Sequence, residues 1–85
     1  MIRARAEVEA LTPYVKDDAT VRDVVLEVLL HDNNGGVRSL ALQTLQPVSA
    51  DSAVRMELQF LAEKDKDTAI KRQAKAILST LPEID

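Results

Sequence analysis

The sequence of 85 residues contains no cysteine, which excludes a disulfide framework, a thiolate metal site and a cysteine nucleophile. The single histidine, His31, makes a histidine-rich metal site unexpected as well. Aromatic residues make up 2% of the chain, which leaves few rings to stack on a chromophore or a nucleic-acid base. The longest apolar runs are interrupted by Glu27 and are far shorter than the about 18 residues that span a bilayer, so we expect a soluble segment.

Glycine and proline are also scarce, with two and three residues respectively, and the apolar residues recur at intervals of three and four. This spacing is typical of amphipathic α-helices and predicts an all-α fold. The sequence predicts five helices, over residues 2–12, 19–31, 35–46, 52–64 and 68–81. Four residues that precede helical runs are predicted N-caps, because their side chains can accept from the first free amides: Asp18, Asn34, Asp51 and Asp67. The prolines lack an amide donor and fall where helices must end, at positions 13, 47 and 82.

The sequence contains an internal repeat. Residues 21–48 align with residues 54–81 at a shift of 33 positions. The identical pairs are Val21 with Val54, Arg22 with Arg55, Asp32 with Asp65, Ala41 with Ala74, and Leu45 with Leu78. Residues 2–14 resemble the second half of this unit, which gives a half repeat over 1–14 and repeats over 18–48 and 51–81. A repeat of this length with two helices predicts a solenoid, in which the stacking of neighbouring units supplies the core.

Two segments carry a resemblance to a known family. Residues 32–38 and 65–71 each contain an Asp, a short turn and then Val-Arg or Ile-Lys, followed by Ala and Leu four residues apart. This pattern is similar to the signature of the HEAT repeat family of armadillo-like helical solenoids. The resemblance implies one domain over residues 1–85, folded as a right-handed α-α superhelix of about two and a half helical hairpins. Because Met1 enters in the middle of a repeat, we expect the chain to be a fragment of a longer protein.

The resemblance to HEAT repeats also implies a structural role for the polar residues at the turns. In that family such residues form a hydrogen-bonded ladder between repeats. The corresponding residues here are Asp32 and Arg38 in one rung, and Asp65 and Lys71 in the next. Because a lysine is a point donor and lacks the planar fork of arginine, we expect the second rung to be weaker.

A narrower resemblance concerns the first full repeat. Val21-Arg22, followed by residues 29–32 and an Asn-Gly turn, looks like the helical-repeat region of some bacterial zinc-finger anti-sigma-factor-like regulators. Those regulators carry a His and Cys zinc-binding segment, often followed by a membrane span, and this sequence has neither. The resemblance implies the docking or sensing part of a bacterial transcription regulator.

Apolar residues at helical spacing define the expected core. The second helices of the two repeats are predicted to bury Val37, Leu40, Ala41 and Leu45, and Ile70, Ala74, Ile77, Leu78 and Leu81. Residues that could carry out catalysis form no recognisable motif, since there is neither a Gly-rich phosphate loop nor a Ser, His and Asp nucleophile motif. We therefore expect no catalytic activity, no bound metal and no cofactor, with part of a HEAT-like lyase enzyme as an alternative.

Charge is distributed unevenly along the chain. The 11 basic and 14 acidic residues give a net charge of −3, which argues against nucleic-acid binding through overall charge. Residues 2–12, 36–47 and 69–81 nevertheless carry six basic residues against two acidic ones. In HEAT solenoids the second helices line the concave side, so the resemblance implies a basic concave side that favours an acidic helix or tail as partner.

The sequence therefore predicts a protein–protein interaction scaffold. The candidate partner-binding residues are Arg38, Leu42, Lys71, Arg72 and Lys75. Tyr14 and Phe60 are further candidates for apolar contacts with a partner protein. A nucleic-acid-binding surface on the basic concave side and end-to-end self-association stay open as alternatives.

Overall fold

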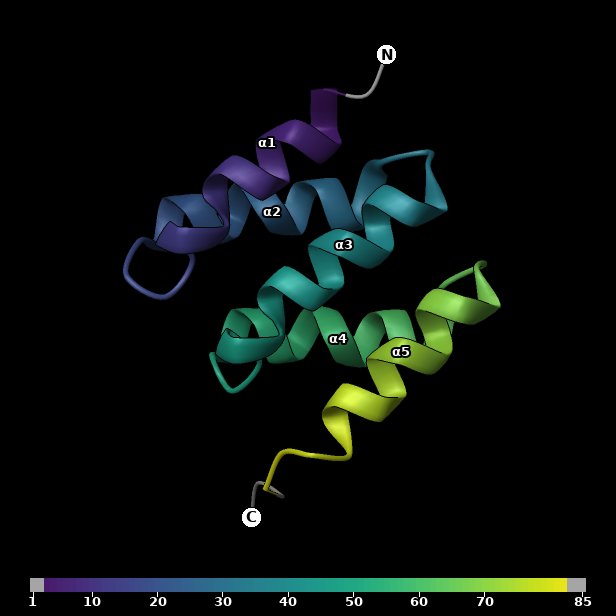
Figure 1. Cartoon of the computed structure of the whole chain (residues 1–85). Helices are drawn as coiled ribbons and strands as arrows, with labels where there is room; N and C mark the ends of the chain where they lie inside the picture. Colours follow the sequence, from purple (N-terminus) through teal and green to yellow (C-terminus); the bar gives the residue numbers. More distant parts are fainter. Residues whose placement is uncertain (1–2, 83–85) are drawn as a thin grey trace. The chain divides into compact units, whose positions relative to one another are not determined.

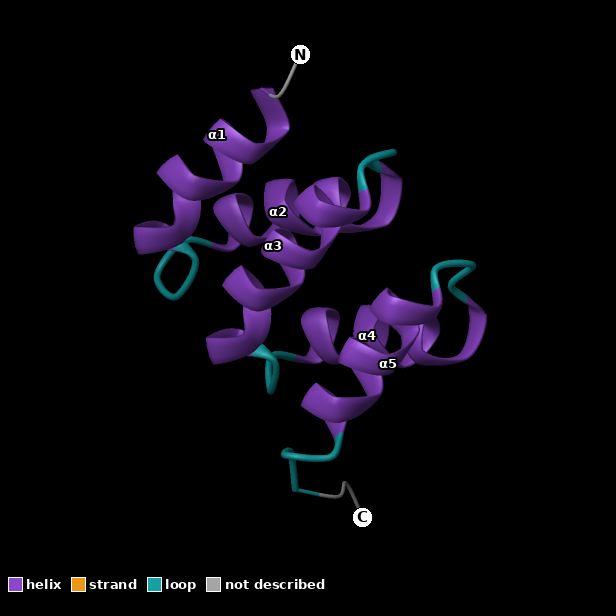
Figure 2. Ribbon diagram, turned by 45° about the vertical axis from the view of Figure 1, so that its right-hand side comes forward, coloured by secondary structure: helices purple, strands orange, loops and turns teal. Residues whose placement is uncertain are grey.

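A computed structural model describes residues 3–82, and this part of the chain is entirely helices, turns and loops, with no strand (Figures 1 and 2). The α-helices are α1 (Arg3–Leu11), α2 (Ala19–His31), α3 (Gly35–Leu45), α4 (Ser52–Lys64) and α5 (Thr68–Leu78). Two 3₁₀ turns, η1 (Thr12–Tyr14) and η2 (Gln46–Val48), follow α1 and α3. The predicted all-α fold with five helices is therefore confirmed. Within the described range, no helix combines the length and the apolar character that crossing a membrane requires.

The chain divides into two compact units. The first unit ends at Val48 and holds α1, α2 and α3. The second unit begins at Ser49 and holds α4 and α5. Each unit contains one complete helical hairpin, and the first unit also contains the additional helix α1.

The three helices of the first unit share one core. α2 and α3 pack against each other as a hairpin, and α1 packs on both of them (Figure 1). The buried residues include Val8 of α1, Val25 and Leu29 of α2, and Val37 and Leu45 of α3. The Thr12 hydroxyl donates to the Val8 carbonyl oxygen at 2.8 Å and lies 3.4 Å from the Thr44 hydroxyl, which links the end of α1 to α3.

The second unit is a single hairpin with its own core. α4 contributes the buried residues Val54, Leu58, Leu61 and Ala62, and α5 contributes Ile70, Ala74 and Ile77. Beyond α5, the carbonyl oxygen of Pro82 accepts a hydrogen bond from Nη2 of Arg55 on α4. The end of the described chain is thereby held against the hairpin.

The bounds of the helices follow the shift of the sequence repeat. That shift carries both ends of α2 onto the ends of α4, and both ends of α3 onto the ends of α5. The turns within the two hairpins also match. The Asp32 carboxylate accepts from the backbone N–H of Asn34 at 2.8 Å, and the Asp65 carboxylate accepts from the backbone N–H of Asp67 at 2.9 Å. The repeat is therefore present in the backbone as well as in the sequence.

The predicted N-caps are confirmed at all four helix starts: Asp18, Asn34, Asp51 and Asp67. In each case a side-chain oxygen accepts from the backbone N–H groups two and three residues further along, over distances of 2.8–3.4 Å. These bonds satisfy amides that have no partner within the helix, so the cap residues determine where α2, α3, α4 and α5 begin.

The end of α5 differs from the prediction. The expected helix over 68–81 ends at Leu78, because the residues that follow turn more tightly. The Ser79 hydroxyl donates to the Ala76 carbonyl oxygen at 2.7 Å, and the Thr80 hydroxyl donates to the Ile77 carbonyl oxygen at 2.6 Å. Short polar side chains that bond to backbone carbonyls compete with helical hydrogen bonding in this way. Leu81, expected in the core, is half-buried outside the helix.

Candidate functional site

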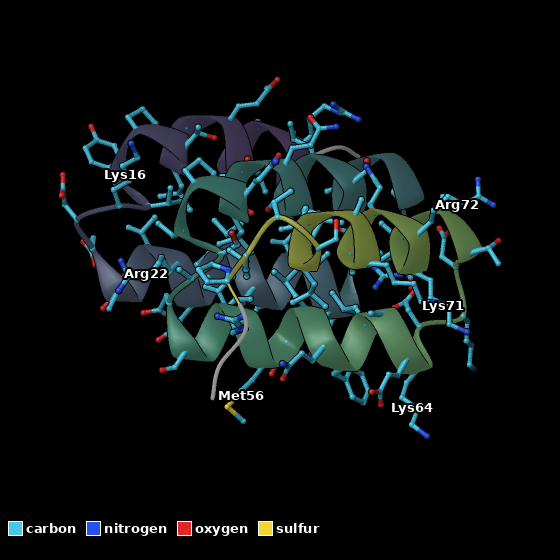
Figure 3. The ribbon with its side chains drawn as sticks, turned by 90° about the horizontal axis from the view of Figure 1, so that it is seen from below. Lys16, Arg22, Met56, Lys64, Lys71 and Arg72 are labelled. Atoms are coloured by element: carbon cyan, nitrogen blue, oxygen red, sulfur yellow. The ribbon has the colours of Figure 1, made fainter. Side chains whose placement is uncertain are left out.

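The most distinctive surface of the described chain is one face of α5. The opposite face of this helix is buried through Ile70, Ala74 and Ile77. The solvent-facing side carries a stripe at helical spacing, which we call the α5 cationic stripe: Thr68, Lys71, Arg72 and Lys75. Positions three and four residues apart are neighbours on a helix surface, so these side chains follow one another over two turns. Figure 3 shows Lys71 and Arg72 projecting from the early turns of α5.

The surface at the α5 cationic stripe is hollowed. A depression of about 300 Å³ is lined by Thr68, Lys71, Arg72 and Lys75. Thr68, Arg72 and Lys75 are exposed, whereas Lys71 is half-buried. The three cationic groups and the hydroxyl therefore border one space that is accessible from solvent.

The cations of the stripe are not paired with acidic side chains of their own helix. α5 contains no Asp or Glu, and within residues 3–82 the side chains of Lys71, Arg72 and Lys75 make no hydrogen bond or ion pair. The nearest preceding acid, Asp67, accepts from the amides of Ala69 and Ile70 as the N-cap. Lys75 lies three and four residues after Arg72 and Lys71, and each like-charge pair at such spacing destabilises a helix by about 0.2–0.5 kcal/mol.

The corresponding positions of α3 lack this character. In the repeat alignment, the stripe corresponds to Gly35, Arg38, Ser39 and Leu42, which include one cation. Nε of that cation, Arg38, donates to the Leu29 carbonyl oxygen at 2.6 Å and so connects α3 to α2. The charge of the α5 cationic stripe is therefore a property of α5 and not of the repeat.

The five candidate partner-binding residues do not form one site within a single unit. Arg38 and Leu42 belong to the first unit, and Lys71, Arg72 and Lys75 belong to the second. Leu42 has no exposed surface, and it lies in the core beside the buried residues Ala41 and Leu45. The expected contact anchor at Leu42 is thus corrected to a core residue, because a buried side chain cannot contact a partner.

Three of the four residues of the expected ladder, all except Lys71, make hydrogen bonds at the turns of their own hairpins. The Asp32 and Asp65 carboxylates accept from the amides of Asn34 and Asp67, and Arg38 donates to Leu29. These bonds close the turn between the two helices of each hairpin. A ladder between repeats stays a prediction.

Two exposed apolar side chains on α4 form a second candidate surface. Met56 and Phe60 lie one turn apart, with 67% and 54% of their surfaces exposed, and Figure 3 shows Met56 projecting away from α4. The corresponding residues of α2 are acidic, Asp23 and Glu27. Phe60 was singled out in the sequence, as was the exposed Tyr14, but Met56 was not. A comparison of equivalent positions in the two repeats would have revealed Met56, because the corresponding residue of α2 is acidic.

Groups that could hold a metal ion are absent from the described range, since no three His, Asp or Glu residues come together there. His31 instead pairs with Glu27 on the surface of α2, with 3.3 Å between Nε2 and Oε2. Compared with known proteins, the sequence matches no family model, no curated protein and no solved structure. Function is therefore inferred from the residues of the chain itself.

Proposed function

We propose that the chain is a non-catalytic protein-interaction module built from HEAT-like helical repeats, and that its α5 cationic stripe binds an acidic segment of another protein. The observation that carries this proposal is the group of three cationic side chains around one hollow, with no acidic residue on the same helix. A surface of this kind attracts negative charge and disfavours basic partners.

The helical-repeat part of the proposal is supported by two features. The helix bounds, the N-caps and the turn hydrogen bonds all recur at the shift of the sequence repeat. Within the first unit, α1 packs on α3 as well as on α2, as the second helix of a preceding repeat would. Repeat proteins of this kind keep a constant framework and vary the exposed residues, which is where their binding specificity arises.

An acidic protein segment fits the α5 cationic stripe better than a nucleic acid does. The stripe is short, and the net charge of the chain is −3, so a long phosphate backbone would meet little additional positive charge. Single-stranded nucleic acids also need aromatic platforms for their bases. The two aromatic residues of the chain, Tyr14 and Phe60, belong to η1 and α4, and neither is among the residues that line the hollow.

The proposal is tested by fluorescence anisotropy with a labelled glutamate-rich peptide and its glutamine counterpart. We expect the chain to bind the glutamate-rich peptide alone, and the variant with Arg72→Glu and Lys75→Glu to lose affinity on the order of tenfold or more. The matched control carries Lys16→Glu and Lys64→Glu, two exposed lysines outside the stripe, and has the same net charge. Circular dichroism verifies that both variants fold.

Two results would overturn the proposal. An equal loss of affinity in the control variant would show that only the net charge of the chain matters. Tighter binding of a single-stranded oligonucleotide with the same net charge as the peptide would assign the stripe to nucleic acid instead.

A further inference from the structure

We infer that the hollow on α5 receives a phosphoryl group carried by a side chain of the bound segment. This inference rests on the proposed function and specifies the chemistry of the partner. It follows from the number, kind and spacing of the groups that line the hollow, which are Thr68, Lys71, Arg72 and Lys75.

The charge around the hollow is concentrated. Three cations lie within little more than one turn of α5, at positions 71, 72 and 75. A carboxylate brings one negative charge and two oxygens, whereas a phosphoryl group on a side chain brings about −1.5 to −2 charges and three strong acceptor oxygens. The phosphoryl group therefore neutralises this cluster with one ligand, and an acidic segment would need two or three carboxylates in the same small space.

The side chains around the hollow offer a phosphoryl group three different kinds of donor. The Arg72 guanidinium presents a planar fork that bonds two phosphoryl oxygens at once, and the two lysines supply point charges. The Thr68 hydroxyl is an additional donor at the edge of the same space. Lys71 is half-buried, since a lysine can cover apolar surface with its aliphatic stem and keep its ammonium group in water.

The ligand would be held by side chains and not by the start of the helix. The amides of Ala69 and Ile70 already donate to the Asp67 carboxylate, which occupies the N-terminal end of α5. The Asp65 carboxylate is bonded to the Asp67 amide in the preceding turn. Both acids lie outside the lining of the hollow, which contains no acidic residue.

α3 provides an internal comparison. Its equivalent positions hold one cation, Arg38, whose Nε is bonded to the Leu29 carbonyl oxygen, together with the fully buried Leu42. These positions have the same place in the repeat but could not hold a phosphoryl group. The phosphoryl site is therefore a specialisation of α5.

The test compares labelled peptides with identical neutral flanks and a central phosphoserine, glutamate or serine, alongside the glutamate-rich peptide. We expect the phosphoserine peptide to bind at least about tenfold more tightly than the single-glutamate peptide, because of its greater charge and additional oxygen. Arg72→Lys keeps the charge but removes the planar fork, so it should weaken binding of the phosphoserine peptide more than binding of the glutamate-rich peptide. The variant with Lys16→Glu and Lys64→Glu should bind the phosphoserine peptide as the wild type does.

The outcomes separate this inference from the proposed function. Binding of the glutamate-rich peptide without any preference for phosphoserine over glutamate would overturn the phosphoryl site and leave the proposed function standing. Binding of neither peptide would overturn both. Inorganic phosphate serves as a competitor, and if it binds as tightly as the phosphoserine peptide, the assignment to a partner's side chain is wrong and a free anion is the ligand.

Discussion

Arg38 on α3 donates a hydrogen bond of 2.6 Å from Nε to the carbonyl oxygen of Leu29, in the last turn of α2. The bond joins the two helices of the first hairpin at a carbonyl that has no partner within its own helix. The equivalent residue of the second hairpin, Lys71, makes no hydrogen bond within the described residues. The same position in the repeat therefore has a structural role in one hairpin and presents a charge to solvent in the other.

This difference predicts unequal costs for the same substitution at the two positions. Arg38→Ala should lower the free energy of unfolding by about 1.5–3 kcal/mol, since a hydrogen bond from a charged group is lost. Lys71→Ala should change it by less than about 0.5 kcal/mol, as is usual for a side chain without specific partners. Urea denaturation followed by circular dichroism measures both. A comparable loss for Lys71→Ala would mean that Lys71 has a structural role, as the ladder predicted from the sequence requires.

Gly36→Ala is expected to stabilise the first unit. A Cβ atom at this position would lie 3.2 Å from Nη2 of Arg5 and 3.2 Å from Oδ1 of Asn34. The Arg5 side chain is long and exposed, so it can move aside, and the equivalent residue of α5 is already an alanine, Ala69, beside the N-cap Asp67. The gain in helix propensity of about 0.5–1 kcal/mol should therefore be retained in thermal unfolding. A lower melting temperature would show that the bonds to the Asn34 cap cannot adjust.

The exposed apolar pair on α4 should be dispensable for folding. The double substitution Met56→Gln and Phe60→Gln should change the free energy of unfolding by less than about 0.5 kcal/mol per site, because both side chains are largely exposed. Leu58→Ala, between them in sequence but buried, should cost about 2–5 kcal/mol. Denaturant titrations distinguish the two results. A large loss for the glutamine variant would place Met56 or Phe60 in the core.

Phosphate should raise the melting temperature of the chain more than sodium chloride at equal ionic strength does. A ligand that binds only the folded state stabilises it by an amount that grows with the logarithm of one plus the ratio of ligand concentration to Kd. Phosphate also stabilises proteins generally by exclusion from their surface, so the informative quantity is the difference between variants. Arg72→Gln with Lys75→Gln should lose the specific part of the gain, whereas Lys16→Gln with Lys64→Gln should keep it. Equal gains in the two variants would argue against an anion site on α5.

The features that depend on local sequence were predictable. The starts of α2, α3, α4 and α5 follow from an acceptor side chain placed before free amides, and the repeat follows from matching residues at a constant shift. The early end of α5 was missed because the hydroxyls of Ser79 and Thr80 compete for helix carbonyls, an effect that apolar spacing does not reveal.

The candidate site was predictable in part. Lys71, Arg72 and Lys75 stand out by charge alone, whereas Thr68 and the hollow depend on how side chains project in three dimensions. The burial of Leu42 and the exposure of Met56 also depend on which sides of their helices are covered. Spacing along the sequence identifies a face of a helix but does not say what covers it.

The N-caps at Asp18, Asn34, Asp51 and Asp67 have a consequence for how such a chain can evolve. Each of the two hairpins contains the N-cap residues at which its own helices begin. When a segment with one hairpin is duplicated, these N-caps are therefore duplicated with it. Duplication of the codons for one repeat would therefore add a complete hairpin in a single genetic event, because the turn between its two helices is already encoded in the copied segment. The new copy could then change its exposed residues independently, as the contrast between Asp23 and Glu27 on α2 and Met56 and Phe60 on α4 illustrates.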